Sequence, residues 1–240
     1  MLDVLIFAAH PDDAEIGMAG TIAKLAQSGF KVGIIDLTAG EMGTRGNAKL
    51  RKKEADAAAK IMNVEVRENL NLPDGKVKLN DEFTKKIVVK IRQYQPKIIF
   101  VNYFNDRHPD HIGSAANVKE AFFFSGVKKY ITKHKNKTQQ MYRPKKLFYF
   151  MNAYEFKPSF IFDISETFEV KQKALAAYGS QFYNPKAKSK EPETFISQPA
   201  FIKMIEARAR VYGFNIGKEY GEPFYCEESI EMDLKNLLSD

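Results

Sequence analysis

The feature that most constrains the fold of this chain is a repeated pairing of a buried strand with a helix. Residues 2–9 (LDVLIFAA) form an almost unbroken apolar run, which is typical of a strand buried on both faces of a parallel sheet. Pro11 ends that run, and apolar residues then recur at helical spacing over residues 14–28, before Gly29. Because the same alternation continues along the chain, we expect a parallel sheet with right-handed crossovers.

The predicted fold class is α/β, with a Rossmann-like, open and mostly parallel sheet that is flanked by helices. The expected strand order is 3-2-1-4-5, in which strands 1 and 4 are neighbours at the switch point. We expect residues 1–240 to form one domain. Further strands are predicted at 31–37, 65–70, 97–104, 147–151 and 160–163, with an edge strand at 223–226. Further helices are predicted at 49–62, 81–94, 112–124, 165–178 (with Ser165 as N-cap) and 200–212, with a short acidic helix in the tail.

The composition is that of an ordinary globular protein, with 44% hydrophobic and 28% charged residues. The longest apolar runs have the length of a strand, so neither a membrane-spanning segment nor a signal peptide is expected. A single cysteine, Cys226, excludes an internal disulfide framework and a thiolate metal cluster. We therefore expect a cytoplasmic protein with no membrane partner.

Two polar clusters follow two of the buried strands. Residues 10–13 (HPDD) come after the first strand, and residues 106–111 (DRHPDH) come after the fourth. The two clusters contain three of the four histidines in the chain. Because strands 1 and 4 are predicted to be neighbours, and ligands bind at the carboxyl ends of such strands, the clusters should form one site.

Imidazole nitrogens and carboxylate oxygens without thiolates suit zinc, iron or manganese. His10 and Asp13 are three residues apart around a turn, so their side chains can converge on one ion. A third ligand from the second cluster would leave one coordination position open for water. Asp12 points differently from Asp13 and could serve as a general base. The competing interpretations are that Asp12 and Asp13 cap the following helix, and that His108 and His111 are polar residues at a helix entry.

The paired motifs resemble those of the PIG-L/LmbE-like zinc N-deacetylases, which remove the N-acetyl group from molecules that contain N-acetylglucosamine (GlcNAc). The resemblance covers HPDD with the following EIG at residues 15–17, and HPDH at residues 108–111. More narrowly, DLT at 36–38, LR at 50–51, NLPD at 71–74 and DRH at 106–108 look like the bacillithiol-pathway branch. Members of that branch deacetylate N-acetylglucosaminyl malate (GlcNAc-malate), and we expect that substrate here.

The resemblance implies a role for each residue of the two clusters. Asp12 would be the general base, His108 would stabilise the oxyanion, and Asp110 would orient His108. It also implies a homo-oligomer, either a trimer or a hexamer, and it leaves iron open in place of zinc. The implied zinc ligands are His10, Asp13 and His111.

Two arginines are candidates for binding an anionic substrate, because a guanidinium binds carboxylates and hydroxyls in a forked geometry. Arg107 immediately precedes His108, whereas Arg51 lies on a predicted helix. A surface ion pair with Glu41 or Glu54 is the competing interpretation for Arg51.

Other function classes fit the sequence less well. Residues 128–146 carry eight Lys or Arg and no acid, which favours a solvated surface but also fits a non-enzymatic nucleic-acid-binding module. We expect no nucleic-acid partner, because no recognised module accompanies this stretch. A Rossmann nucleotide site would need a G-x-G-x-x-G motif, which is missing after the first strand. Two histidines and a carboxylate also describe iron oxygenases, but those normally use an all-β scaffold. If the protein is a deacetylase, a chitooligosaccharide is the alternative substrate.

Overall fold

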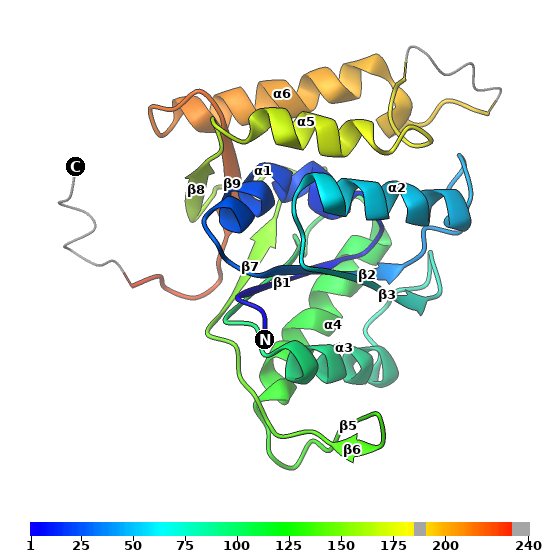
Figure 1. Ribbon diagram of the computed structural model, residues 1–240, viewed down its shortest axis with the longest axis vertical. Helices are drawn as coiled ribbons and strands as arrows, with labels where there is room; N and C mark the ends of the chain where they lie inside the picture. Colours follow the sequence, from blue (N-terminus) through cyan, green and yellow to red (C-terminus); the bar gives the residue numbers. More distant parts are fainter. Residues whose placement is uncertain (185–190, 232–240) are drawn as a thin grey trace.

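The computed structural model describes residues 1–184 and 191–231 of the chain. Seven strands form one sheet in the order β3-β2-β1-β4-β7-β9-β8 (Figure 1). Five of them are parallel: β1 (Val4–Ala8), β2 (Val32–Thr38), β3 (Val66–Leu72), β4 (Ile98–Asn102) and β7 (Lys146–Phe150). This confirms the predicted α/β class and the order 3-2-1-4-5, since β7 is the fifth strand expected from the sequence.

The end of the sheet differs from the prediction at one strand. β9 (Gly221–Tyr225) was expected at the edge, but it runs antiparallel between β7 and β8 (Phe160–Asp163). Phe224 pairs with Phe150 on one side and with Phe160 on the other, and its side chain is fully buried. The local pattern of a short strand could not reveal a second neighbour, so β8 is the edge strand instead.

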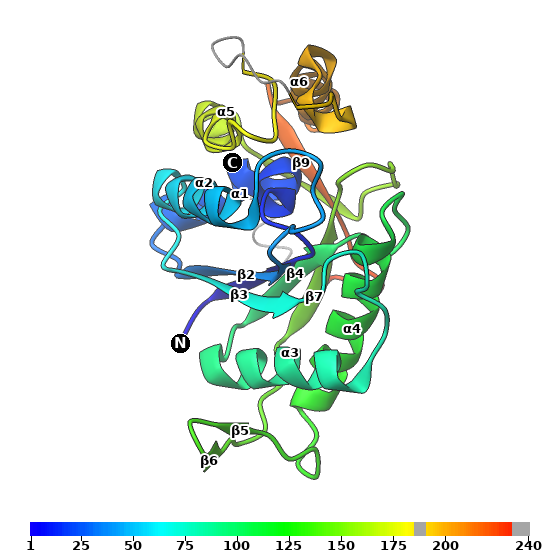
Figure 2. The ribbon, with the colours of Figure 1, turned by 90° about the vertical axis from the view of Figure 1, so that its right-hand side faces the viewer.

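Helices cover both faces of the sheet (Figures 1 and 2). On one face, α3 (Asp81–Tyr94) and α4 (Pro109–Ser125) bury one apolar cluster against the strands. The other face carries α1 (Asp13–Gln27) and α2 (Ala48–Ile61). Outside them lie α5 (Phe168–Ala176) and α6 (Pro199–Phe214), which form a further layer seen at the top of Figure 1.

Two local features differ from the sequence-based expectation. Ser165 does not cap α5, which begins after Thr167; the Ser165 hydroxyl instead donates to the Asp163 carboxylate at 2.7 Å. The basic stretch contains a hairpin, β5 (Lys133–His134) and β6 (Lys137–Thr138), that was not predicted.

The expected acidic helix of the tail falls largely in 232–240, outside the described residues. No helix among residues 1–184 and 191–231 is long and apolar enough to cross a membrane.

Candidate metal centre and catalytic site

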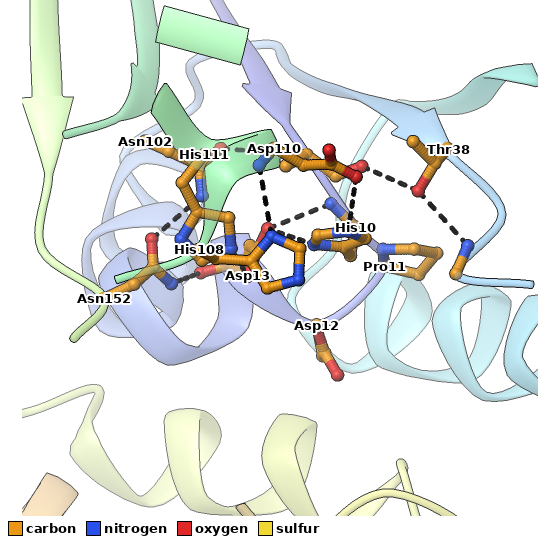
Figure 3. A network of polar contacts seen from close by, with 12 residues as sticks. His10, Pro11, Asp12, Asp13, Thr38, Asn102, His108, Asp110, His111 and Asn152 are labelled. Atoms are coloured by element: carbon orange, nitrogen blue, oxygen red, sulfur yellow. Dashed lines mark hydrogen bonds and ion pairs between the residues drawn. The ribbon is translucent and has the colours of Figure 1, made fainter. Parts of the chain in front are cut away.

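The two polar clusters meet at the carboxyl ends of β1 and β4, which are neighbours in the sheet (Figure 3). His10 lies in the turn after β1, while His108 caps α4 and His111 belongs to its first turn. The ring centroid of His10 lies 4.6 Å from that of His108 and 5.5 Å from that of His111. The three rings can each offer a nitrogen within 4.8 Å of the others, which is close enough to hold one metal ion. The predicted adjacency of the two clusters is thus observed.

His10 has carboxylates on both sides of its ring. Nδ1 lies 3.4 Å from Oδ2 of Asp13, and Nε2 lies 3.0 Å from Oδ1 of Asp74 and 3.4 Å from Oδ2 of Asp110. Asp74 belongs to the turn that follows β3, so a third strand end contributes to the site. All four side chains are buried.

His111 repeats this arrangement with its nitrogens exchanged. Nε2 lies 3.2 Å from Oδ1 of Asp13, and Nδ1 lies 3.1 Å from Oδ1 of Asp106. Asp13 therefore lies between the two imidazoles, and each ring has a second carboxylate at its other nitrogen. A histidine that binds a metal through one nitrogen normally meets a carboxylate or carbonyl at the other. Asp106 has this position relative to His111, and Asp74 has it relative to His10.

The charges of these groups suit a divalent cation. Burial disfavours the cationic form of His111, but Asp13 and Asp106 outweigh it and raise its pKa to about 9. Burial likewise opposes charge on His10, yet Asp110, Asp13 and Asp74 hold its pKa well above the ordinary value. A cation bound by neutral imidazoles would replace protons that the surrounding carboxylates attract. Two nitrogens and a carboxylate without thiolate form a donor set that fits zinc or iron.

Asp12 faces away from these ligand candidates. Its backbone has a φ of 113°, a value that residues other than glycine rarely adopt. Its side chain makes no capping hydrogen bond to α1. The capping interpretation is therefore wrong for Asp12. In Figure 3 its carboxylate points away from Asp13 and the imidazoles. Burial raises the pKa of Asp12 to about 7, although Arg51 opposes that shift.

Arg51 on α2 is buried against the Asp12 turn. Its Nη2 donates to Oδ2 of Asp12 at 2.7 Å, and its Nε donates to the carbonyl of Pro11 at 3.0 Å. Gly40 allows this approach, because a Cβ at that position would lie 2.3 Å from Nη1 of the arginine. The surface ion-pair interpretation of Arg51 is wrong; among its expected partners, Glu54 binds Ser180 instead.

His108 is positioned by the start of α4. Its Nδ1 accepts a hydrogen bond from the backbone N–H of Asp110 at 3.2 Å, so the proton of the neutral ring is on Nε2. Burial together with His10 and His111 lowers the pKa of His108. The Asp110 carboxylate accepts from the N–H groups of Gly75 and Val77 at 2.7 and 3.1 Å and faces His10. The structure thus places the Asp110 carboxylate beside His10, whereas the hydrogen bond to the His108 ring comes from the Asp110 backbone N–H.

Except for Pro11 and Asp110, the residues of the two clusters line one pocket together with Arg51 and Asp74, and its volume of about 540 Å³ is within the range of small-molecule sites. Arg107 is exposed at its rim, with its guanidinium carbon 4.5 Å from the ring centroid of Phe195. None of the carboxylates in residues 1–184 and 191–231 forms an ion pair with Arg107. The wall also includes Met42, Thr44, Arg45, Gln181, Ile196 and Phe201.

Sequence reasoning did not predict Asp74 as a member of the site, and it gave Asp106 no role although Asp106 belongs to the second polar cluster. Both follow a strand end on the same edge of the sheet, Asp74 after β3 and Asp106 after β4, and that placement was the available signal. Asp106 is 4% exposed, and its oxygens also accept from the N–H groups of His108 and Ala153, both at 3.1 Å. It therefore joins the second cluster to the end of β7.

Comparisons with known proteins point to one family. Residues 5–122 match the family model described as PIG-L, GlcNAc-PI de-N-acetylase. The chain is similar to the diacetylchitobiose deacetylase of Thermococcus kodakarensis, with 32% identity over 191 residues, covering 75% of this chain and 70% of that protein.

Solved structures agree with the match. The conserved protein TT1542 from Thermus thermophilus has 32% identity and a TM-score of 0.87, covering 98% of each chain. The N,N'-diacetylchitobiose deacetylase from Pyrococcus horikoshii, solved with its inhibitor MPG, has 27% identity and a TM-score of 0.78, covering 92% of this chain and 82% of that one.

Proposed function

This chain belongs to the PIG-L family of de-N-acetylases, and from that premise we propose that it removes the N-acetyl group of GlcNAc-malate, a small anionic GlcNAc conjugate. It is a metal-dependent amide hydrolase that acts on a GlcNAc-type substrate. The products would be acetate and the free amine. The observation that carries the proposal is the buried set of two imidazoles around Asp13, with a separate carboxylate, Asp12, facing the same pocket.

We assign the metal to His10 Nδ1, Asp13 and His111 Nε2, and we propose zinc as the ion, with iron as the alternative. The assignment is supported by the carboxylates at the opposite ring nitrogens of both histidines. His10, Asp74 and Asp110 also lie close enough to hold an ion, but that set would use the nitrogen of His10 that faces away from Asp13. When bound, zinc supplies Lewis acidity to the amide carbonyl and to the attacking water.

Asp12 is proposed to accept the proton of the attacking water. Its carboxylate lines the pocket without facing Asp13, so it is free of the proposed ligand set. Arg51 holds one carboxylate oxygen, Oδ2, which fixes the direction in which the group accepts a proton. We therefore give Arg51 a positioning role, in place of the substrate-binding role expected from the sequence.

His108 is proposed to stabilise the oxygen that becomes negative as the amide carbonyl is attacked. With Nδ1 occupied by the Asp110 N–H, the ring presents Nε2–H as a donor even when it is neutral. The proton that Asp12 receives can then pass to the departing amine. Asp110 would act mainly by holding His10 and the turn that carries Asp74.

The malate group of the substrate is assigned to Arg107. This guanidinium is exposed at the pocket rim and lacks a carboxylate partner in the described part of the chain, so a substrate carboxylate can bind it. Two relatives are named diacetylchitobiose deacetylases, and a neutral chitooligosaccharide is therefore the second candidate substrate. The expected trimer or hexamer and the cytoplasmic location stay predictions.

The test is acetate release by zinc-loaded protein offered GlcNAc-malate, GlcNAc or diacetylchitobiose, each with and without a chelator. We expect chelator-sensitive hydrolysis, with the highest kcat/KM for GlcNAc-malate. Equal kcat/KM for all three would retain the deacetylase and remove the malate assignment. Zinc-loaded protein that releases acetate from none of them would contradict the proposal. Salt-dependent binding of nucleic acid by such an inactive protein would favour the basic hairpin as the functional surface.

A further inference from the structure

An exposed aromatic ring stands at the rim of the pocket and does not belong to the metal centre. Phe195 lies on η1 (Phe195–Ser197), a single 3-10 turn, and is 54% exposed although it lines the pocket. The guanidinium of Arg107 lies over the face of this ring, 4.5 Å from its centroid. The two residues come from distant parts of the chain, the loop before α4 and the turn before α6.

The orientation of the Phe195 ring is set by the core. The rings of Phe195 and Phe201 form a T-shaped contact with the centroids 5.6 Å apart and the planes at 69°. Phe201 is 6% exposed and is stacked on Phe182, which is 2% exposed, at 5.9 Å. A chain of aromatic contacts therefore runs from the buried α5–α6 layer to the pocket rim and ends at the guanidinium.

The backbone of the turn is also fixed. The N–H of Thr194 donates to Oγ of Ser197 at 2.8 Å, and the N–H of Ser197 donates to the carbonyl of Thr194 at 3.2 Å. The Ser197 hydroxyl also donates to the Thr194 carbonyl at 3.1 Å, so the two ends of the turn that carries Phe195 are tied together. The turn and the contact with Phe201 thus hold the ring at the position where the Arg107 guanidinium lies over it.

We propose that Phe195 is a specificity-determining, positioning residue that holds Arg107 ready for the carboxylate of an anionic substrate. Arginine has a long side chain with many rotamers, and an exposed one must lose that freedom when it binds a ligand. A guanidinium that already lies over an aromatic ring has lost part of this conformational freedom before the ligand binds. The N–H groups at the edge of the guanidinium stay free to bind a carboxylate. Phe195 thereby contributes to anion selectivity without contacting the anion.

This inference rests on the proposed function, because it requires an anionic substituent on the substrate. Two competing roles for Phe195 make different predictions. A ring that stacked on the sugar, or that only completed the pocket wall, would contribute equally to the binding of neutral and anionic GlcNAc conjugates. A ring that acts through Arg107 must contribute more to the anionic ones.

The experiment compares KM for GlcNAc-malate with KM for diacetylchitobiose in zinc-loaded wild-type, Phe195→Leu, Phe195→Tyr, Arg107→Ala and Arg107→Ala/Phe195→Leu proteins. Leucine keeps apolar contact with Phe201 but has no aromatic face, whereas tyrosine keeps the face. We expect Phe195→Leu to raise the ratio of KM for the anionic substrate to KM for the neutral one by roughly twofold to fivefold, which is the size of an exposed cation–π contact. Phe195→Tyr should restore the wild-type ratio, and Phe195→Leu should add nothing once Arg107 is absent.

A matched control exists near the other end of α4. Arg143 lies over the ring of Phe123 at 5.2 Å, and Phe123 is 56% exposed and outside the pocket. Phe123→Leu removes the same type of contact and should leave the KM ratio unchanged.

The inference is overturned if Phe195→Leu raises both KM values by the same factor, or if it changes the ratio equally in the Arg107→Ala background. Failure of the proposed function gives a different result, because Arg107→Ala would then leave the ratio at its wild-type value. If Arg107→Ala shifts the ratio and Phe195→Leu does not, only the role of Phe195 is rejected.

Discussion

Arg51 donates a hydrogen bond from Nη2 to Oδ2 of Asp12 across 2.7 Å, and both side chains are buried. The same guanidinium holds the Pro11 carbonyl through Nε. The turn that carries the candidate general base is thus fastened to α2, although 39 residues separate the two partners. Removing one partner of such a buried ion pair strongly lowers the free energy of unfolding, because the other charge is left unpaired.

Arg51→Met should therefore lower the free energy of unfolding by roughly 3 kcal/mol, measured by denaturant unfolding. Arg51→Lys, which lacks the fork that contacts both Asp12 and Pro11, should lower kcat by the same factor for GlcNAc-malate and diacetylchitobiose. A rise of KM confined to the anionic substrate would instead identify Arg51 as a ligand of the malate group.

Asp12→Asn should abolish proton transfer while preserving the shape of the side chain. We expect kcat to fall by roughly 10² to 10⁴, the usual contribution of a general base, and the unfolding midpoint to fall as well, because the buried Arg51 guanidinium loses its charged partner. Activity and the unfolding midpoint are measured on the same preparation. The surface substitution Asp56→Asn, which disrupts only the pair with Lys52, is the control and should match wild type. Near-normal turnover by Asp12→Asn would exclude Asp12 as the base.

Asp106→Asn tests the carboxylate partner of His111. Asparagine has one acceptor oxygen, so it can keep the N–H bond of His108 or that of Ala153 but not both, and it cannot provide the negative charge beside Nδ1 of His111. Zinc affinity, measured by competition with a chromophoric chelator, should fall by roughly 10- to 100-fold. Unchanged affinity would mean that Asp106 acts only on the loop backbone. Asp74→Asn is expected to act in the same direction through His10.

Zinc should stabilise the folded chain, because the proposed ligands come together only in that state. At a free zinc concentration of 100 times Kd, the gain in the free energy of unfolding should be about 2.7 kcal/mol over chelator-treated protein. Differential scanning calorimetry with and without zinc measures the effect. In His111→Ala the gain should largely disappear; a gain equal to that of wild type would place the ion elsewhere.

Gly113→Ala probes how α4 is seated against the turn after β3. A Cβ at Gly113 would lie 1.6 Å from the carbonyl oxygen of Val77, so the turn that binds Asp110 and carries Asp74 must move. We expect a loss of roughly 1–3 kcal/mol in stability together with weaker zinc binding. Gly179→Ala, where the nearest atom would be 3.6 Å away, is the matched control with a small effect. Equal stability of the two variants would contradict this packing.

Local patterns in the sequence were enough to predict the sheet and the meeting of the two polar clusters. An unbroken apolar run such as residues 2–9 reports burial on both faces, and its alternation with helical spacing restricts the topology to few choices. Once β1 and β4 are neighbours, His10 and His111 must lie at the same edge, because parallel strands end together. These inferences need only the spacing of apolar residues along the chain and the handedness of the crossover connections.

Contacts between distant side chains were decided by the tertiary structure alone. Asp74 reaches His10 across 64 positions of sequence, and Arg51 turns inward to Asp12 instead of outward to solvent. The interior position of β9 and the ring of Phe195 beneath Arg107 are of the same kind. The sequence alone was enough to bring residues 10–13 and 106–111 to one edge of the sheet, because hydrophobic periodicity and strand order are local and topological properties. Which atom faces which depends on rotamers and helix placement, and these are settled only when the whole core packs.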